Sequence, residues 1–152
     1  IGVAPEAKAL CIKGLSDSGS GSYSGLVEAL QYCIDTKPDI VSMSLGGPSA
    51  HAPMHDKIKK LHEMNIPVIC AAGNSGDSGV NYPAKFPETI SIAAYDKYGN
   101  IAGFSSKGDQ VDFAAPGVSV YSTFLNQQYS RMSGTSMACP FMAGVVALML
   151  SR

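Results

Sequence analysis

The residues best suited to chemistry lie in one short stretch near the C-terminus, Ser133 to Pro140. This turn of small residues places one hydroxyl, that of Ser136, just before an apolar run from Phe141 to Leu150. Pro140 is expected in the first turn of a helix, where a missing backbone N–H is tolerated. Free N–H groups at a helix N-terminus favour negative charge, which suits a nucleophilic serine. A serine that only caps a buried helix agrees equally with this stretch.

A second candidate, Asn74, lies in the segment Cys70 to Gly76, directly after a predicted strand. A side-chain amide at a strand end, among residues too small to block a peptide, can donate a hydrogen bond to an oxyanion. An asparagine beside a glycine is also a common turn residue. The segment alone leaves both interpretations open.

These residues must be positioned by an alternating series of strands and helices. Apolar patterning predicts strands over residues 7–14, 39–45 and 68–72, and a linker rich in Ser and Gly over residues 17–22. Two helices are predicted between the strands, because apolar residues recur at helical spacing. The first has Leu26, Ala29, Leu30 and Cys33 on one face and ends before Pro38. The second begins at Pro53, has Met54, Ile58 and Leu61 on one face and ends near Asn65.

This alternation is typical of right-handed crossovers that build a parallel sheet, and it predicts an α/β fold. Ligands of such sheets gather at the carboxyl ends of the strands, which directs attention to the loops 15–22, 46–50 and 73–81. Further along, residues 89–94 alternate as a strand, and residues 118–123 and 128–132 are expected to pair as a hairpin across residues 125–127.

Composition limits the class of protein. The 152 residues, 45% of them hydrophobic, indicate one domain over 1–152, and the net charge of -1 with 15% charged residues gives no basic surface for nucleic acid. No apolar run is long enough to cross a membrane, and no signal peptide is visible. Four cysteines in apolar segments, Cys11, Cys33, Cys70 and Cys139, are expected to be reduced core thiols, which favours an intracellular location.

Seven short motifs follow one another along the chain: residues 2–5 (GVAP), 43–47 (MSLGG), 71–74 (AAGN), 82–84 (YPA), 104–106 (FSS), 115–117 (APG) and 134–138 (GTSMA). In this order they resemble the subtilisin-like serine proteases, and the resemblance covers essentially the whole chain. It implies a three-layer fold with a central parallel sheet, incomplete at both ends. The serine motif is not the G-x-S-x-G elbow of α/β-hydrolases.

The resemblance also implies roles for individual residues. Ser136 would be the acylated nucleophile, and Asn74 with the Ser136 backbone N–H would form the oxyanion hole. The remaining implied positions would bind an extended peptide or protein substrate. A strand edge for the substrate backbone would be formed by Gly19, Ser20 and Gly21, with Tyr23 close by. The primary specificity pocket would have one wall made of Ser44, Leu45 and Gly46, a second wall made of Ala71, Ala72 and Gly73, and Asn81 near its base.

The catalytic histidine and aspartate motifs of the family are absent from these 152 residues. The three histidines, His51, His55 and His62, are expected to be surface or edge residues. A serine hydroxyl without a base is a poor nucleophile, so the chain alone is expected to be inactive. The sequence therefore predicts a fragment that begins after the family's tight calcium loop. This fragment would need a missing N-terminal segment that carries the Asp and the His. Its exposed sheet edges are expected to make it self-associate. A pseudoprotease or peptide-binding scaffold is the alternative.

The family also has a weak cation site made of backbone carbonyls. By resemblance these would belong to Ala84, Phe86 and Thr89, with Asp112 as a nearby carboxylate, and oxygen ligands suit calcium or sodium. Asp112 as an ordinary turn carboxylate is equally open. No cofactor is expected for the chemistry itself.

Overall fold

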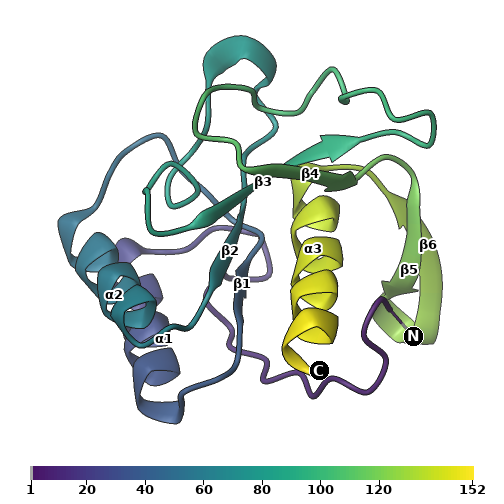
Figure 1. Ribbon diagram of the computed structural model, residues 1–152. Coiled ribbons are helices and arrows are strands. Elements are labelled where there is room, and N and C mark those ends of the chain that lie inside the picture. Colours follow the sequence, from purple (N-terminus) through teal and green to yellow (C-terminus); the bar gives the residue numbers. More distant parts are fainter. Residues whose placement is uncertain (1) are drawn as a thin grey trace.

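Figure 1 shows the protein as a computed structural model, which describes residues 2–152; Ile1, where the predicted fragment begins, lies outside the described residues. Its centre is a parallel sheet of four strands in the order β1-β2-β3-β4. The strands are β1 (Val41–Met43), β2 (Val68–Ala71), β3 (Ile90–Tyr95) and β4 (Phe113–Pro116). All three pairs are parallel, so the carboxyl ends of the strands lie along one edge, as the predicted crossovers require.

Helices α1 (Tyr23–Thr36) and α2 (Ala52–Glu63) cover one face of this sheet. The Ser22 hydroxyl caps α1 by accepting from the N–H of Gly25, and Lys37 ends the helix in a left-handed conformation. The buried residues of both helices are those that the apolar spacing selected: Leu26, Leu30 and Cys33 in α1, and Met54, Ile58 and Leu61 in α2. Both helix predictions are therefore confirmed.

Helix α3 (Thr135–Leu150) covers the other face. A second core cluster forms there, in which Ile69 and Ile92 of the sheet pack with Ala138 and Cys139 of the helix. Two helices, a sheet and a third helix make three layers, so the predicted three-layer α/β architecture is confirmed. None of the helices formed by residues 2–152 has the length and apolar character needed to cross a membrane.

Strands β5 (Val120–Phe124) and β6 (Gln128–Met132) form the predicted antiparallel hairpin around the short helix η2 (Leu125–Gln127). The hairpin ends at Met132, three residues before α3 begins. It therefore returns the chain from β4 to the carboxyl edge of the sheet, where Ser136 lies. The other short helix, η1 (Gly76–Ser78), follows the segment that contains Asn74.

Three local predictions are wrong. Residues 7–14 form no strand, and Leu10 and Ile12 are 55% and 39% exposed, because no neighbouring strand pairs with this segment within the described chain. Pro140 lies inside α3 rather than in its first turn, since the helix begins at Thr135. Cys11 is exposed on the unpaired segment, whereas the other three cysteines are buried free thiols as predicted.

Candidate active site

Ser136 is the second residue of α3 and is partly exposed at the carboxyl edge of the sheet. Gly134 occupies the N-cap position, and its carbonyl oxygen accepts from the N–H groups of Met137 and Ala138. The N–H of the second residue of a helix has no acceptor within the helix. The Ser136 N–H is therefore available to donate a hydrogen bond to a ligand that the Ser136 hydroxyl contacts.

The side chain of Asn74 is oriented by α3. Its Oδ1 accepts from the Thr135 N–H at 2.9 Å and from the Thr135 hydroxyl at 3.0 Å, which leaves Nδ2 pointing away as a donor. A Cβ placed on Gly134 would lie 3.6 Å from Asn74 Nδ2, 3.7 Å from Asn74 Oδ1 and 3.6 Å from the Ser136 nitrogen. The Asn74 amide and the Ser136 nitrogen, from distant parts of the sequence, therefore lie near the same point beside Gly134.

Thr135 is part of the candidate site although the sequence did not predict a role for it. Its side chain is fully buried, and its hydroxyl accepts from the Gly73 N–H at 3.2 Å while donating to Asn74. Its position directly before Ser136 is a signal, but its partners lie about sixty residues earlier. Only the packing of α3 against the end of β2 brings these groups together.

The two predicted walls of the specificity pocket follow adjacent strands. Ser44, Leu45 and Gly46 continue from β1, and Ala71 is the last residue of β2, with Ala72 and Gly73 directly after it. The Asn81 side chain lies between the walls, since a Cβ on Gly73 would be 2.7 Å from Asn81 Nδ2 and one on Gly46 would be 3.2 Å from Asn81 Cβ. Gly73 also has φ +115°, so only glycine is suited to this wall.

The predicted peptide-binding edge lies in a turn rather than in a strand. The Gly19 N–H donates to the Ser16 carbonyl, and the Ser16 N–H donates to the Ser20 carbonyl. Tyr23 is fixed at the start of α1, where its hydroxyl donates to the Ser49 carbonyl at 3.1 Å and its ring stacks on His51 at 4.6 Å. Tyr23 therefore links α1 to the loop that follows β1.

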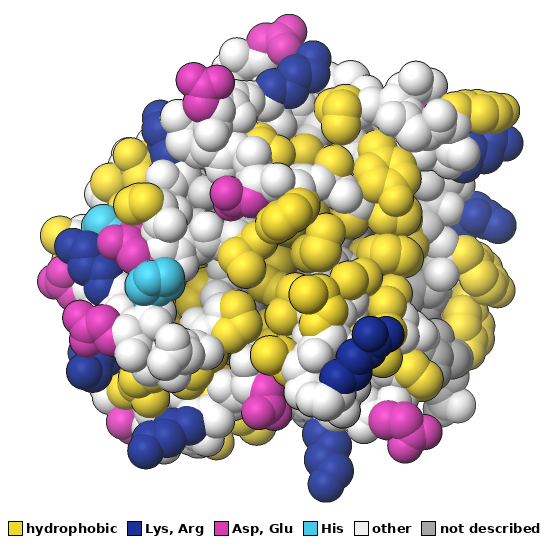
Figure 2. Space-filling model, viewed as in Figure 1, with side chains coloured by type: hydrophobic (Ala, Val, Ile, Leu, Met, Phe, Trp, Pro, Cys, Tyr) yellow, Lys and Arg dark blue, Asp and Glu magenta, His cyan; other side chains and the backbone are white. Residues whose placement is uncertain are grey.

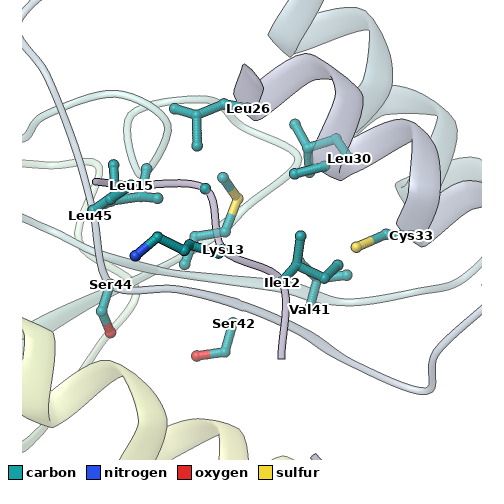
Figure 3. Close-up of a pocket in the computed structure, with 13 residues that line it drawn as sticks. Ile12, Lys13, Leu15, Leu26, Leu30, Cys33, Val41, Ser42, Ser44 and Leu45 are labelled. Carbon is teal, nitrogen blue, oxygen red and sulfur yellow. The ribbon is translucent and has the colours of Figure 1, made fainter. Parts of the chain in front are cut away.

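A groove runs beside the free edge of β1, which pairs only with β2 among the described strands. One part, of about 370 Å³, lies between residues 12–15, α1 and residues 41–45, and Figure 3 shows Leu26 and Leu30 above Ile12 and Val41 in it. A second part, of about 960 Å³, lies between residues 2–12, residues 38–42 and α3. Figure 2 shows apolar side chains gathered across the middle of this face, where Figure 1 has β1 and α3.

None of the three histidines reaches Ser136 through a hydrogen bond within residues 2–152. His51 precedes α2, and His62 is exposed on it. His55 Nε2 is 2.7 Å from Glu88 Oε2, and its ring stacks on Phe86 with ring centroids 3.9 Å apart. His55 thus fastens α2 to the loop before β3, and none of the three histidines is bonded to the serine within the described residues.

Two carbonyls of the implied cation site, those of Ala84 and Phe86, lie close to a buried hydroxyl of the same loop. The buried Thr89 hydroxyl lies 2.8 Å from the Phe86 carbonyl oxygen and 3.2 Å from those of Pro83 and Ala84. One oxygen of Asp112 accepts from the Ser91 N–H at 2.8 Å. The hydroxyl has a single proton, so it donates to one of these carbonyls at a time, and the cation site stays a prediction.

Burial makes the thiols near the site poor nucleophiles. Desolvation raises the pKa of Cys139, one turn after Ser136, and its thiol donates to the Ile69 carbonyl at 3.3 Å. Desolvation and the neighbouring Cys139 raise the pKa of Cys70. The thiolate is the reactive form, so burial disfavours both thiols as nucleophiles, and Ser136 stays the predicted nucleophile.

Comparison with known proteins shows which family the chain is similar to. The sequence profile of the subtilase family matches residues 1–152. Subtilisin DY of Bacillus licheniformis is 44% identical over 156 residues, covering all of this chain and 57% of the relative, and subtilisin E of Bacillus subtilis (strain 168) is 42% identical, covering all of this chain and 41% of the relative.

Solved structures show the same fold. The prenylagaramide maturation protease PagA matches with a TM-score of 0.84 at 30% identity, over 90% of this chain and 52% of that protein. Sphericase matches with a TM-score of 0.78 at 34% identity, over 88% of this chain and 51% of that protein. The chain thus spans about half the length of the relatives that it matches.

Proposed function

The chain belongs to the subtilase family, and we propose that it is the part of a serine endopeptidase that carries the nucleophile, the oxyanion hole and the specificity pocket. The observation that carries this proposal is the pair of N–H donors, Asn74 Nδ2 and Ser136 N, which lie near the same point beside Gly134. Such donors stabilise an oxyanion more strongly than the ground-state carbonyl.

In the proposed reaction, Ser136 Oγ forms a bond to the carbonyl carbon of a peptide while its proton passes to a base. The carbonyl oxygen gains negative charge between the two N–H donors. Collapse breaks the C–N bond, the amine leaves with the proton, and water hydrolyses the acyl-enzyme. No step requires a metal ion or another cofactor.

The proposed substrate is an extended peptide. The ends of β1 and β2 form two neighbouring walls with Asn81 between them, which provides a place for one side chain of the substrate. The exposed turn at Gly19 to Gly21 and the Tyr23 ring lie on the α1 side of these walls. Backbone pairing would supply affinity, and the pocket would supply selectivity.

The base is proposed to come from a segment outside these 152 residues, since the relatives are about twice as long. The groove beside β1 supports this proposal. A parallel strand placed there would pair with the free edge of β1 and end next to Ser44, which contacts Ser136. The same strand would lie between β1 and residues 7–14, and its second edge could pair with those residues.

The test is labelling of Ser136 by a fluorophosphonate, with the full-length protein compared with the 152-residue chain. Rapid labelling of the full-length protein, lost in Ser136→Ala and absent from the 152-residue chain, is the expected result. The absence of a histidine bonded to Ser136 favours a second candidate, a peptide-binding scaffold without protease activity. A full-length protein that binds peptides but leaves Ser136 unlabelled would establish that candidate instead.

A further inference from the structure

Pro140 removes a hydrogen bond from the residue that carries the nucleophile. In an α-helix the N–H of residue 140 would donate to the carbonyl of residue 136, four residues earlier. Proline has no N–H, and Pro140 lies inside α3. The carbonyl of Ser136 therefore lacks the backbone N–H that would donate to it in a regular α-helix.

The hydroxyl of Ser44 takes the place of this missing donor. Ser44 Oγ donates to the Ser136 carbonyl oxygen at 2.9 Å, although 92 residues separate the two in sequence. Ser44 follows β1 directly and belongs to a predicted wall of the specificity pocket. The end of β1 is thus bonded to the backbone of the nucleophilic residue.

The first turn of α3 is consequently held from two sides. Thr135 is bonded to Asn74, beyond the end of β2, and Ser136 is bonded to Ser44, beyond the end of β1. The attacking Oγ and one oxyanion donor, the Ser136 N–H, belong to the same residue. A small rotation of that residue would displace both groups at once, and reaction rates are sensitive to such displacement.

Resting on the proposed function, we infer that Ser44 is a positioning residue for catalysis, which fixes Ser136 through the carbonyl that Pro140 leaves free. Pro140 and Ser44 act as a pair. Pro140 leaves the Ser136 carbonyl without its usual N–H donor, and the Ser44 hydroxyl donates to that carbonyl, which links α3 to the end of β1. Ser44 itself makes no contact with the reacting atoms.

A double-mutant cycle in the full-length protein tests this inference. Ser44→Ala should lower kcat roughly tenfold, as expected for the loss of one positioning contact, with KM changed less than about twofold. Ser44→Thr keeps the hydroxyl and should retain most of the activity. Pro140 is exposed, so Pro140→Ala leaves no cavity, and it restores the N–H that can donate to Ser136.

In the Pro140→Ala background, Ser44→Ala should therefore cost less than about twofold in kcat. Rates of fluorophosphonate labelling, measured beside peptide hydrolysis, report the same coupling at the serine itself. Equal losses in both backgrounds, or a loss of thermal stability without a change in kcat, would overturn the inference. If Ser136 is unreactive in the parent protein, the proposed function fails and this inference with it; a reactive parent without coupling overturns this inference alone.

Discussion

At the scale of single residues, the orientation of Asn74 is the feature that the proposed chemistry depends on most. Its oxygen accepts two hydrogen bonds from Thr135, so its nitrogen is the group left to donate to a substrate. A side chain that keeps the oxygen but lacks the nitrogen would retain the packing and lose the donor. This separates a catalytic role from a structural one.

Asn74→Asp in the full-length protein makes this change. Its kcat should fall by at least 10²-fold, in line with the loss of about 10²- to 10³-fold known from subtilisin when an oxyanion donor is removed, because an oxygen replaces the donor. KM for a peptide substrate should change little. Steady-state kinetics provide the measurement.

The matched control is Asn126→Asp, which adds the same charge at an exposed position of the hairpin turn. It should leave kcat within about twofold of the parent. Equal kcat values for Asn74→Asp and the parent would show that Asn74 is only a turn residue.

At the scale of elements, α2 is fastened to the loop before β3 by a partly buried hydrogen bond between His55 and the carboxylate of Glu88. Burial of Glu88 acts to raise its pKa, but hydrogen bonds from His55 and the backbone, with the charge of Lys59, outweigh it and lower the pKa. A lowered folded-state pKa means that the ionised form stabilises the fold. That stabilisation is present above the unfolded value, about 4.3, and is lost as the pH falls through the lower folded value.

Glu88→Gln should therefore reduce the free energy of unfolding by about 0.5–1 kcal/mol at pH 7. The difference from the parent should shrink as the pH falls below about 4. Urea unfolding across this range measures it. Glu63→Gln, which breaks the exposed pair with Lys60 on the same helix, is the control and should change little at any pH. A constant difference for Glu88→Gln would contradict the ionic explanation.

The loop from Pro83 to Thr89 is the second element whose stability can be tested, because its carbonyls converge on the Thr89 hydroxyl. Thr89→Val removes the donor at nearly constant volume and should cost about 1–3 kcal/mol, since buried carbonyls lose their partner. Thr89→Ser keeps the hydroxyl and should cost less. Thermal unfolding in the presence of a chelator gives the comparison.

Amide hydrogen exchange in residues 84–89 then tests the role of cations. Millimolar calcium should leave exchange in the parent unchanged, because the buried Thr89 hydroxyl lies close to the carbonyls of Ala84 and Phe86. Marked slowing of exchange by calcium in the parent would instead indicate an ion bound to these carbonyls.

At the scale of the whole molecule, the surface beside β1 is strongly apolar. Leu148, Met149 and Leu150 at the end of α3 are 45%, 68% and 56% exposed, and the unpaired residues 7–14 lie near them. Apolar surface of this kind, next to a free strand edge, favours association. The 152-residue chain is therefore expected to self-associate.

Sedimentation velocity over a range of concentrations measures this association. The parent chain should form oligomers, and Met149→Lys should weaken them because it places a charge on the apolar surface. Gln128→Lys, which adds the same charge at an exposed hairpin position, should have no such effect. A parent that remains monomeric at all concentrations would refute the prediction.

The sequence alone determined the elements whose signals are local. The apolar spacing of Leu26, Leu30 and Cys33 predicts α1, and the corresponding spacing in α2 is equally regular, because helical period is a property of neighbouring residues. The motif order pointed to the family, and the comparisons confirm it. Residues 7–14 show the limit, since an apolar segment becomes a strand only when another strand pairs with it.

Only the tertiary structure decided how the candidate site is assembled. No local pattern indicates that Thr135 turns the Asn74 amide, or that Ser44 replaces the N–H missing at Pro140. The first bond joins residues that are 61 positions apart in the sequence, and the second joins residues that are 92 positions apart. Both bonds therefore depend on how α3 packs against the ends of β1 and β2. The sequence identifies the candidate reactive groups, but packing between distant segments sets their geometry.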